Sequence, residues 1–95
     1  MKIKVELGGG LEILFDKQKN LEINIEKTEV KIKDIILELY SKIKEKKELF
    51  SSSDGSIKPG IIVLYNDSDW EIYEKEETKL ENNDTLSFIS TLHGG

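Results

Sequence analysis

The sequence predicts an α+β domain in which a mixed sheet of four or five strands packs one face on a single main helix. Three observations lead to this prediction. Apolar and polar residues alternate at the start of the chain, a helical stripe of apolar residues lies near its middle, and short apolar segments typical of strands follow. Because the chain has 95 residues, we expect residues 1–95 to form one domain around one hydrophobic core.

The N-terminal part is predicted to form two antiparallel strands. Apolar and charged residues alternate over residues 2–7, and the glycines at 8–10 end this first strand. A second alternation follows over residues 21–25. The connection between them contains Leu14 and Phe15, which could fold back onto the core or form a short turn of helix. The sequence leaves both possibilities open.

A helix is predicted where the apolar period changes after Lys31. The residues that share one helical stripe are Ile32, Ile35, Ile36, Leu39, Tyr40 and Ile43. Asp34 near the start of this segment and lysines near its end suit the helix dipole. No good capping residue precedes the stripe, since Lys31 is a poor N-cap, so the sequence leaves the exact start of the helix open.

Three more strands are expected after the helix. Residues 61–65 are apolar at both parities and are predicted to form a strand in the middle of the sheet. Trp70 and Ile72 suggest a short strand, although Trp70 itself is expected in the core. Residues 85–91 alternate again and form the last predicted strand. Two strands, a helix and three strands are the element order of the β-grasp fold.

Composition excludes several kinds of function. The chain has no cysteine, so it can form no disulfide, no thiolate metal site and no thioester on a thiol of its own. Its 14 basic residues are all lysines and face 19 acids, for a net charge of -5. Without arginine and with an acidic surface, no direct binding of nucleic acid is expected.

Neither enzymatic chemistry nor membrane insertion is predicted. No residues stand at the spacing of paired catalytic carboxylates, a nucleophile with its base, or a metal-ligand set, so we assign no catalytic residue and no metal site. No apolar run approaches the roughly 20 residues that a membrane span needs, and charges interrupt the N-terminal segment. We therefore expect a soluble monomer in the cytoplasm that could also enter the nucleus.

The last residues carry the most specific signal. Thr91, Leu92, His93, Gly94 and Gly95 follow the final strand, and we expect residues 91–95 to form a flexible tail. Two terminal glycines alone are a weak signal, because small residues at a chain end are common.

The signal becomes specific in combination with other segments. These are the lead-in Ser90 to His93, the turn at Pro59 and Gly60, and the segment Asn66 to Trp70. With them, nearly the whole chain resembles the eukaryotic ubiquitin-related modifier family.

This resemblance implies a ubiquitin-like fold and a carrier function. An E1-like enzyme with sulfurtransferase activity would adenylate the Gly95 carboxylate with ATP and convert it into a thiocarboxylate. The enzyme would use the ATP and the sulfur donor, so this chain would bind no cofactor. The sulfur would pass through a tRNA thiolase complex to the wobble uridine of cytosolic tRNA. The same activated Gly95 could be joined to lysines of target proteins.

The chemistry and the reach of residues 91–95 are consistent with this role. A carboxylate is a poor electrophile, so acyl chemistry at Gly95 requires activation by an ATP-using enzyme. Residues 91–95 can reach roughly 18 Å when extended, and Gly94 adds no side chain that would obstruct a narrow channel. We expect Thr91, Leu92, His93 and Gly94 to be recognised by the enzyme.

A docking surface is expected beside the tail. One helix can cover only one face of the sheet, and Ile89 has the opposite parity to the core residues of the last strand. We therefore expect an exposed apolar patch that includes Ile89 and docks the activating enzyme.

Two other functions remain open at this point. The chain could be a sulfur carrier for molybdopterin or thiamin biosynthesis, which would share the fold and the Gly94-Gly95 ending. It could also be a ubiquitin-like interaction domain that binds partners without reacting. Deletion of Gly94 and Gly95 would separate the second alternative from a carrier, because binding alone would survive it.

Overall fold

The computed structural model describes residues 1–91, and residues 92–95 lie outside the described part. Its strands are β1 (Lys2–Gly8), β2 (Asn20–Asn24), β3 (Ile61–Tyr65), β4 (Ser68–Asp69) and β5 (Thr85–Ser90), and its α-helix is α1 (Ile32–Lys42). Short 3-10 helices span Leu11–Phe15, Lys47–Leu49, Trp70–Ile72 and Lys75–Glu77. No helix within the described residues is long and apolar enough to cross a membrane.

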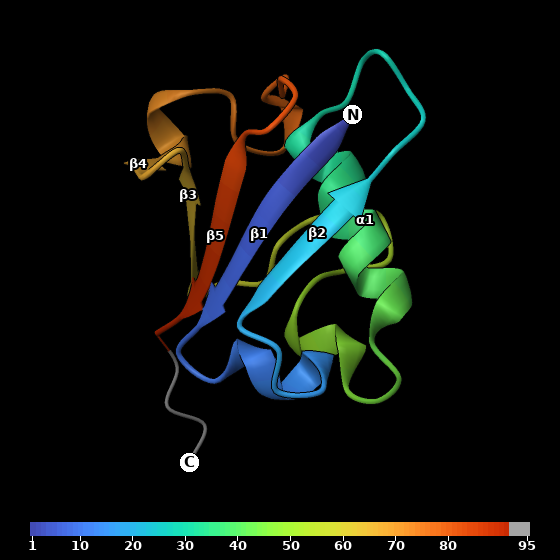
Figure 1. Ribbon diagram of the computed structural model, residues 1–95. Coiled ribbons are helices and arrows are strands. Elements are labelled where there is room, and N and C mark those ends of the chain that lie inside the picture. Colours follow the sequence, from blue (N-terminus) through green and yellow to red (C-terminus); the bar gives the residue numbers. More distant parts are fainter. Residues whose placement is uncertain (92–95) are drawn as a thin grey trace.

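The sheet has five strands in the order β2-β1-β5-β3-β4. β1 and β5 run parallel, and the other neighbouring pairs run antiparallel. α1 crosses one face of the sheet and leaves the other face open (Figure 1). The prediction of an α+β β-grasp fold is therefore confirmed.

The hydrophobic core lies between the sheet and α1. The strand residues buried in it are Ile3, Val5, Leu7, Ile23, Val63, Leu86 and Phe88. Ile32, Ile35, Ile36 and Leu39 come from the predicted stripe of α1 and are fully buried. Phe50 lies between Phe15 and Phe88, with ring centroids 5.7 and 5.4 Å away in edge-to-face geometry. These contacts tie the 3-10 connections to the sheet.

Two questions that the sequence left open are answered by the structure. The connection after β1 both forms a 3-10 helix and folds back, because Phe15 is buried and Leu14 is half-buried against the core, with Leu11 buried as well. α1 begins after Lys31, whose backbone N–H donates to Asp34 Oδ2 at 2.9 Å. The carboxylate three residues inside the helix thus stabilises an N-terminus that lacks a good N-cap side chain.

One expectation about strands is corrected. Trp70–Ile72 forms a 3-10 helix and not a strand, because the Asp69 carboxylate accepts a hydrogen bond from the Glu71 N–H at 2.8 Å and starts a helical turn. The turn buries Trp70 and leaves Ile72 72% exposed. β3 lies inside the sheet, as expected, because it pairs with β5 on one side and with the two-residue β4 on the other; the third of the five strands is β5.

Candidate functional site

The candidate site is the base of the C-terminal tail, where the chain leaves β5. The Thr91 N–H and the Thr91 hydroxyl both donate to the carbonyl oxygen of Gly60, at 2.8 and 2.7 Å. Gly60 belongs to the turn before β3 and has a φ of 91°, a conformation that favours glycine. The last described residue of the chain is therefore fixed to a turn that is distant in sequence.

A second glycine turn lies against the same end of β5. Gly9 has a φ of 66°, and a Cβ placed there would lie 2.1 Å from the carbonyl oxygen of Ser90. Such a distance is a steric clash, so only glycine permits this approach of the turn to the strand. The end of β5 and Thr91 therefore lie between the turns that contain Gly9 and Gly60. The side chain of Thr91 is exposed.

An apolar surface on the open face of the sheet extends from this point. We call Ile62, Leu64 and Ile89 the open-face patch. Ile62 lies opposite Ile89 in the β3–β5 register, and Gly8 lies on the other side of Ile89. Ile62 is 42% exposed, whereas Ile89 and Leu64 are half-buried. An apolar patch that includes Ile89 is therefore present, but Ile62 is its most exposed member.

The structure brings together only some of the predicted site residues. Thr91 lies at the tail base, and Ile89 lies two residues earlier on the open face. Leu92, His93, Gly94 and Gly95 lie outside the described residues. Among residues 1–91, no group of three or more His, Cys, Asp or Glu side chains is placed to hold a metal ion.

The sequence had not singled out Gly9, Gly60 and Ile62 as parts of one site. Gly9 and Gly60 were visible as turn residues, and Ile62 stood in a run that is apolar at both parities. Their common position depends on the strand order, because β5 lies between β1 and β3.

Among the described residues, the most strongly displaced pKa lies at the other end of β5. Tyr65 pairs with Leu86 near the start of that strand, and its hydroxyl donates to Asp84 Oδ2 at 2.6 Å. Burial, followed by the hydrogen bond to the Asp84 carboxylate, raises the pKa of Tyr65 above its usual value. This pair holds the fold together at a distance from the tail base.

The fold and the tail base together define a class of protein. A five-stranded β-grasp sheet packs one face on one helix, and its central strand β5 ends directly before Thr91 (Figure 1). The chain has no cysteine, so it has no side-chain thiol that could carry an acyl group. The chain is a ubiquitin-like β-grasp protein.

Comparison with known proteins gives the family. The family model for Urm1 (Ubiquitin related modifier) matches residues 2–95. The chain is 50% identical to the ubiquitin-related modifier 1 homolog of Dictyostelium discoideum and 48% identical to ubiquitin-related modifier 1 of Schizosaccharomyces pombe, over 100% of both chains in each case. This chain belongs to the ubiquitin-related modifier family.

A solved structure agrees with this assignment. The solution structure of Urm1 from Trypanosoma brucei superposes with a TM-score of 0.81 at 34% identity, over 99% of this chain and 95% of that one. The similarity therefore extends across the whole sheet and helix.

Proposed function

We propose that this chain is a sulfur carrier and protein modifier whose Gly95 carboxylate is activated by an E1-like enzyme. The observation that carries the proposal is the family match, which extends through residue 95. In the first step the carboxylate oxygen attacks the α-phosphorus of ATP, which forms an acyl adenylate and releases pyrophosphate. Sulfur at the oxidation level of sulfide, supplied through the enzyme, then attacks the acyl carbon and displaces AMP, which leaves a thiocarboxylate. ATP and the sulfur donor belong to the partner, and this chain is its substrate.

The tail base supports this role through positioning. Because Thr91 is held by Gly60, only the residues beyond it have to enter the active site of the enzyme. An extended segment of that length reaches roughly 14 Å from Thr91, at about 3.6 Å per residue. The folded body can therefore dock outside the channel, and the open-face patch lies beside the point of entry.

The further partners follow from the same activated group. We propose that the thiocarboxylate supplies a tRNA thiolase complex for 2-thiolation of the wobble uridine, and that the activated Gly95 can also be joined to target lysines. For this role we propose a cytoplasmic location, with access to the nucleus. The acidic chain has no arginine, so the thiolase complex and not this chain would hold the tRNA.

The proposal is tested by incubating the purified protein with ATP, its E1-like enzyme and a sulfur donor, followed by intact mass spectrometry. The mass is expected to increase by the exchange of one oxygen for sulfur. A variant without Gly94 and Gly95 should show no exchange. If the intact protein gains no sulfur but still binds the enzyme, a purely noncovalent interaction domain is the better description.

A further inference from the structure

β2 is an edge strand, and the hydrogen bonds at its two ends show which backbone groups face outward. Met1 and Ile25 exchange two hydrogen bonds, of 2.7 and 2.9 Å, and the Leu7 N–H donates to the Lys19 carbonyl at 2.8 Å. Antiparallel pairs alternate between bonded and non-bonded residues. The odd-numbered residues of this segment therefore face β1, and Asn20, Glu22 and Asn24 direct their N–H and C=O groups away from the sheet.

These outward groups are unpaired within residues 1–91. β2 has β1 as its only neighbour in the sheet, and no turn or side chain of the described part bonds to the backbone of Asn20, Glu22 or Asn24. Figure 1 shows no strand beyond β2 on this side. A row of unpaired backbone groups is a template for the addition of another strand.

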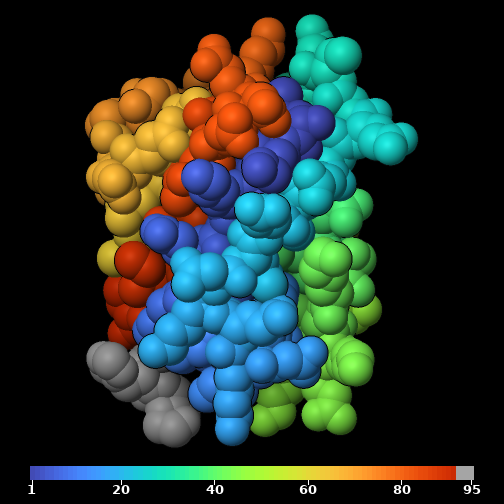
Figure 2. Space-filling model, in the orientation of Figure 1, coloured from blue at the N-terminus to red at the C-terminus, as the bar shows by residue number. Residues whose placement is uncertain are grey.

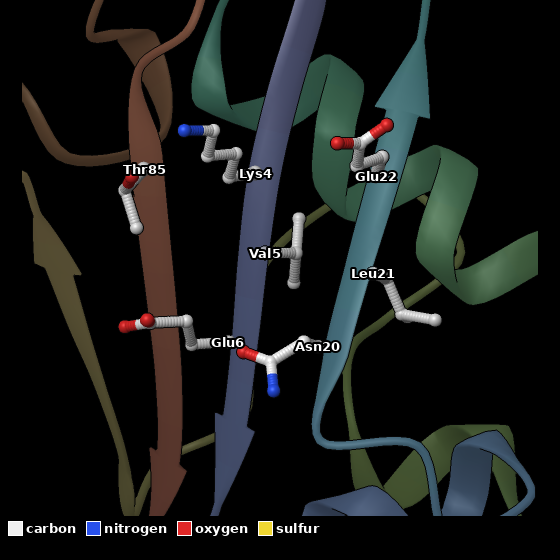
Figure 3. A pocket seen from close by; sticks show the side chains of 7 residues that line it. All are labelled: Lys4, Val5, Glu6, Asn20, Leu21, Glu22 and Thr85. Carbon is white, nitrogen blue, oxygen red and sulfur yellow. The ribbon is translucent and has the colours of Figure 1, made fainter.

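The open-face side of this edge carries one exposed carboxylate, that of Glu22. A hollow of about 240 Å³ lies over β1 and β2, and Asn20, Glu22, Glu6, Lys4 and Thr85 contribute to its lining (Figure 3). Lys4 lies opposite Glu22 in the register, but its side chain points toward Thr85 and away from Glu22 (Figure 3). Glu22 is exposed and forms no salt bridge within the described residues.

The other side of the edge is apolar. Leu21 and Ile25 are half-buried and pack against the core on the helix side of β2. An added strand would therefore meet a carboxylate on one face and apolar side chains on the other. In the space-filling view, residues of β2 lie on the visible face and residues of α1 lie beside them (Figure 2).

A second copy of this chain fits the edge poorly. An antiparallel pair of two β2 strands centred on Glu22 would place the two Glu22 carboxylates directly opposite each other, which is destabilising. Both copies would also carry a net charge of -5. A foreign strand with a cationic residue at that position would turn the same contact into an attraction.

We propose that β2 accepts an extended segment of a partner protein as an additional strand, with a Lys or Arg opposite Glu22 and apolar residues against Leu21 and Ile25. Backbone hydrogen bonds would supply the affinity, and the alternation of side chains would supply the specificity. This inference does not depend on the chemistry of Gly95.

The test starts from a phage-displayed library of random linear peptides selected on the full-length protein. The enriched peptides should share alternating apolar residues and one Lys or Arg. The most enriched peptide is then synthesised and added to the protein, and its binding is followed by NMR. Binding should shift the amide signals of Asn20, Glu22 and Asn24 and slow their hydrogen exchange. Absence of enrichment, enrichment of acidic peptides, shifts that map to another surface, or self-association of the protein would each overturn the proposal.

Matched variants separate the strand edge from general charge. Glu22→Lys should weaken binding of the cationic peptide about tenfold, because it replaces an attraction by a repulsion. Glu26→Lys makes the same charge change at an exposed residue outside β2 and should have little effect. Methylation of the peptide nitrogens that face β2 should abolish binding, and methylation of the alternate nitrogens should preserve it. Equal effects in either comparison would contradict strand addition.

Discussion

At the scale of single residues, Asp84 holds the start of β5 to the neighbouring turns. Its carboxylate accepts hydrogen bonds from the Tyr65 hydroxyl at 2.6 Å, from Asn66 Nδ2 at 3.1 Å and from the Glu81 N–H at 2.7 Å. Asn66 in turn accepts from the Thr85 N–H at 2.8 Å. One short side chain thus joins the end of β3 to the beginning of the central strand.

Replacement of this carboxylate should destabilise the fold. Asp84→Ala leaves three donors without their acceptor and should lower the free energy of unfolding by about 2–4 kcal/mol. Urea denaturation followed by tryptophan fluorescence measures the change. Glu81→Ala is the control, because it removes an exposed carboxylate in the same turn while keeping the backbone N–H that bonds to Asp84. Equal stability of the two variants would contradict the assignment.

The Tyr65 hydroxyl predicts a dependence of stability on alkaline pH. Burial and the bond to Asp84 raise its pKa in the folded protein above the ordinary value of 10.0. The folded state then holds this proton more tightly than the unfolded state, so its contribution is complete below about pH 10 and is lost as the pH rises further. Tyr65→Phe should remove this part of the slope. The free energy of unfolding of both proteins is measured by urea denaturation between pH 9 and about 11. If it falls with pH equally in the unmodified protein and in Tyr65→Phe, the prediction is refuted.

At the scale of elements, the turn after β1 is built for close approach to β5. Gly9→Ala should be strongly destabilising, because its Cβ would meet the Ser90 carbonyl oxygen and the residue keeps a φ of 66°. Gly10→Ala is a matched comparison, since Gly10 has a φ of 99° and a methyl group added there would meet open space, with no obstructing atom within 4 Å.

Gly10→Ala should therefore show only the backbone strain of about 1–2 kcal/mol, and Gly9→Ala should exceed it. Thermal unfolding of both variants measures the difference. Comparable losses would mean that the contact between this turn and β5 is looser than the structure shows.

The open-face patch predicts a separate effect on activation. Ile62→Asp should reduce the efficiency of adenylation with a stability change of less than about 1 kcal/mol, because Ile62 is 42% exposed and outside the core. Ile89→Asp should reduce it as well, at a greater cost in stability because Ile89 is half-buried. Ile72→Asp is the control, since Ile72 is 72% exposed but lies in the 3-10 turn after β4. Unchanged kinetics in folded Ile62 and Ile89 variants would eliminate the docking surface.

Periodicity in the sequence predicted most elements of the fold. The alternation in β1 and β5 and the stripe of α1 each depend on burial of one face, which a single sequence records directly. It failed at Trp70–Ile72, because the Asp69 cap and the burial of Trp70 outweighed an alternation of only two apolar residues. The site was harder to predict from the sequence, since the Thr91–Gly60 contact spans 31 positions and depends on the order of the strands.

At the scale of the whole molecule, the fold and the proposed chemistry are separated along the chain. The core and the sheet are complete by Ser90, and the hydrogen bonds of Thr91 to Gly60 fix the last described residue. The proposed reacting group lies four residues further on. Changes at Gly95 should therefore affect activation and leave the stability of the fold unaltered.

The most direct measurement compares the intact protein with two length variants, one without Gly95 and one with a single residue added after it. Each is incubated with ATP, the E1-like enzyme and a sulfur donor, and intact mass spectrometry records the exchange of oxygen for sulfur. One residue displaces the carboxylate by roughly 3.5 Å, whereas acyl transfer requires reacting atoms about 3–3.5 Å apart. Only the intact protein should gain sulfur, with equal thermal stability in all three; a gain of sulfur in the shortened or extended protein would contradict the assignment of Gly95.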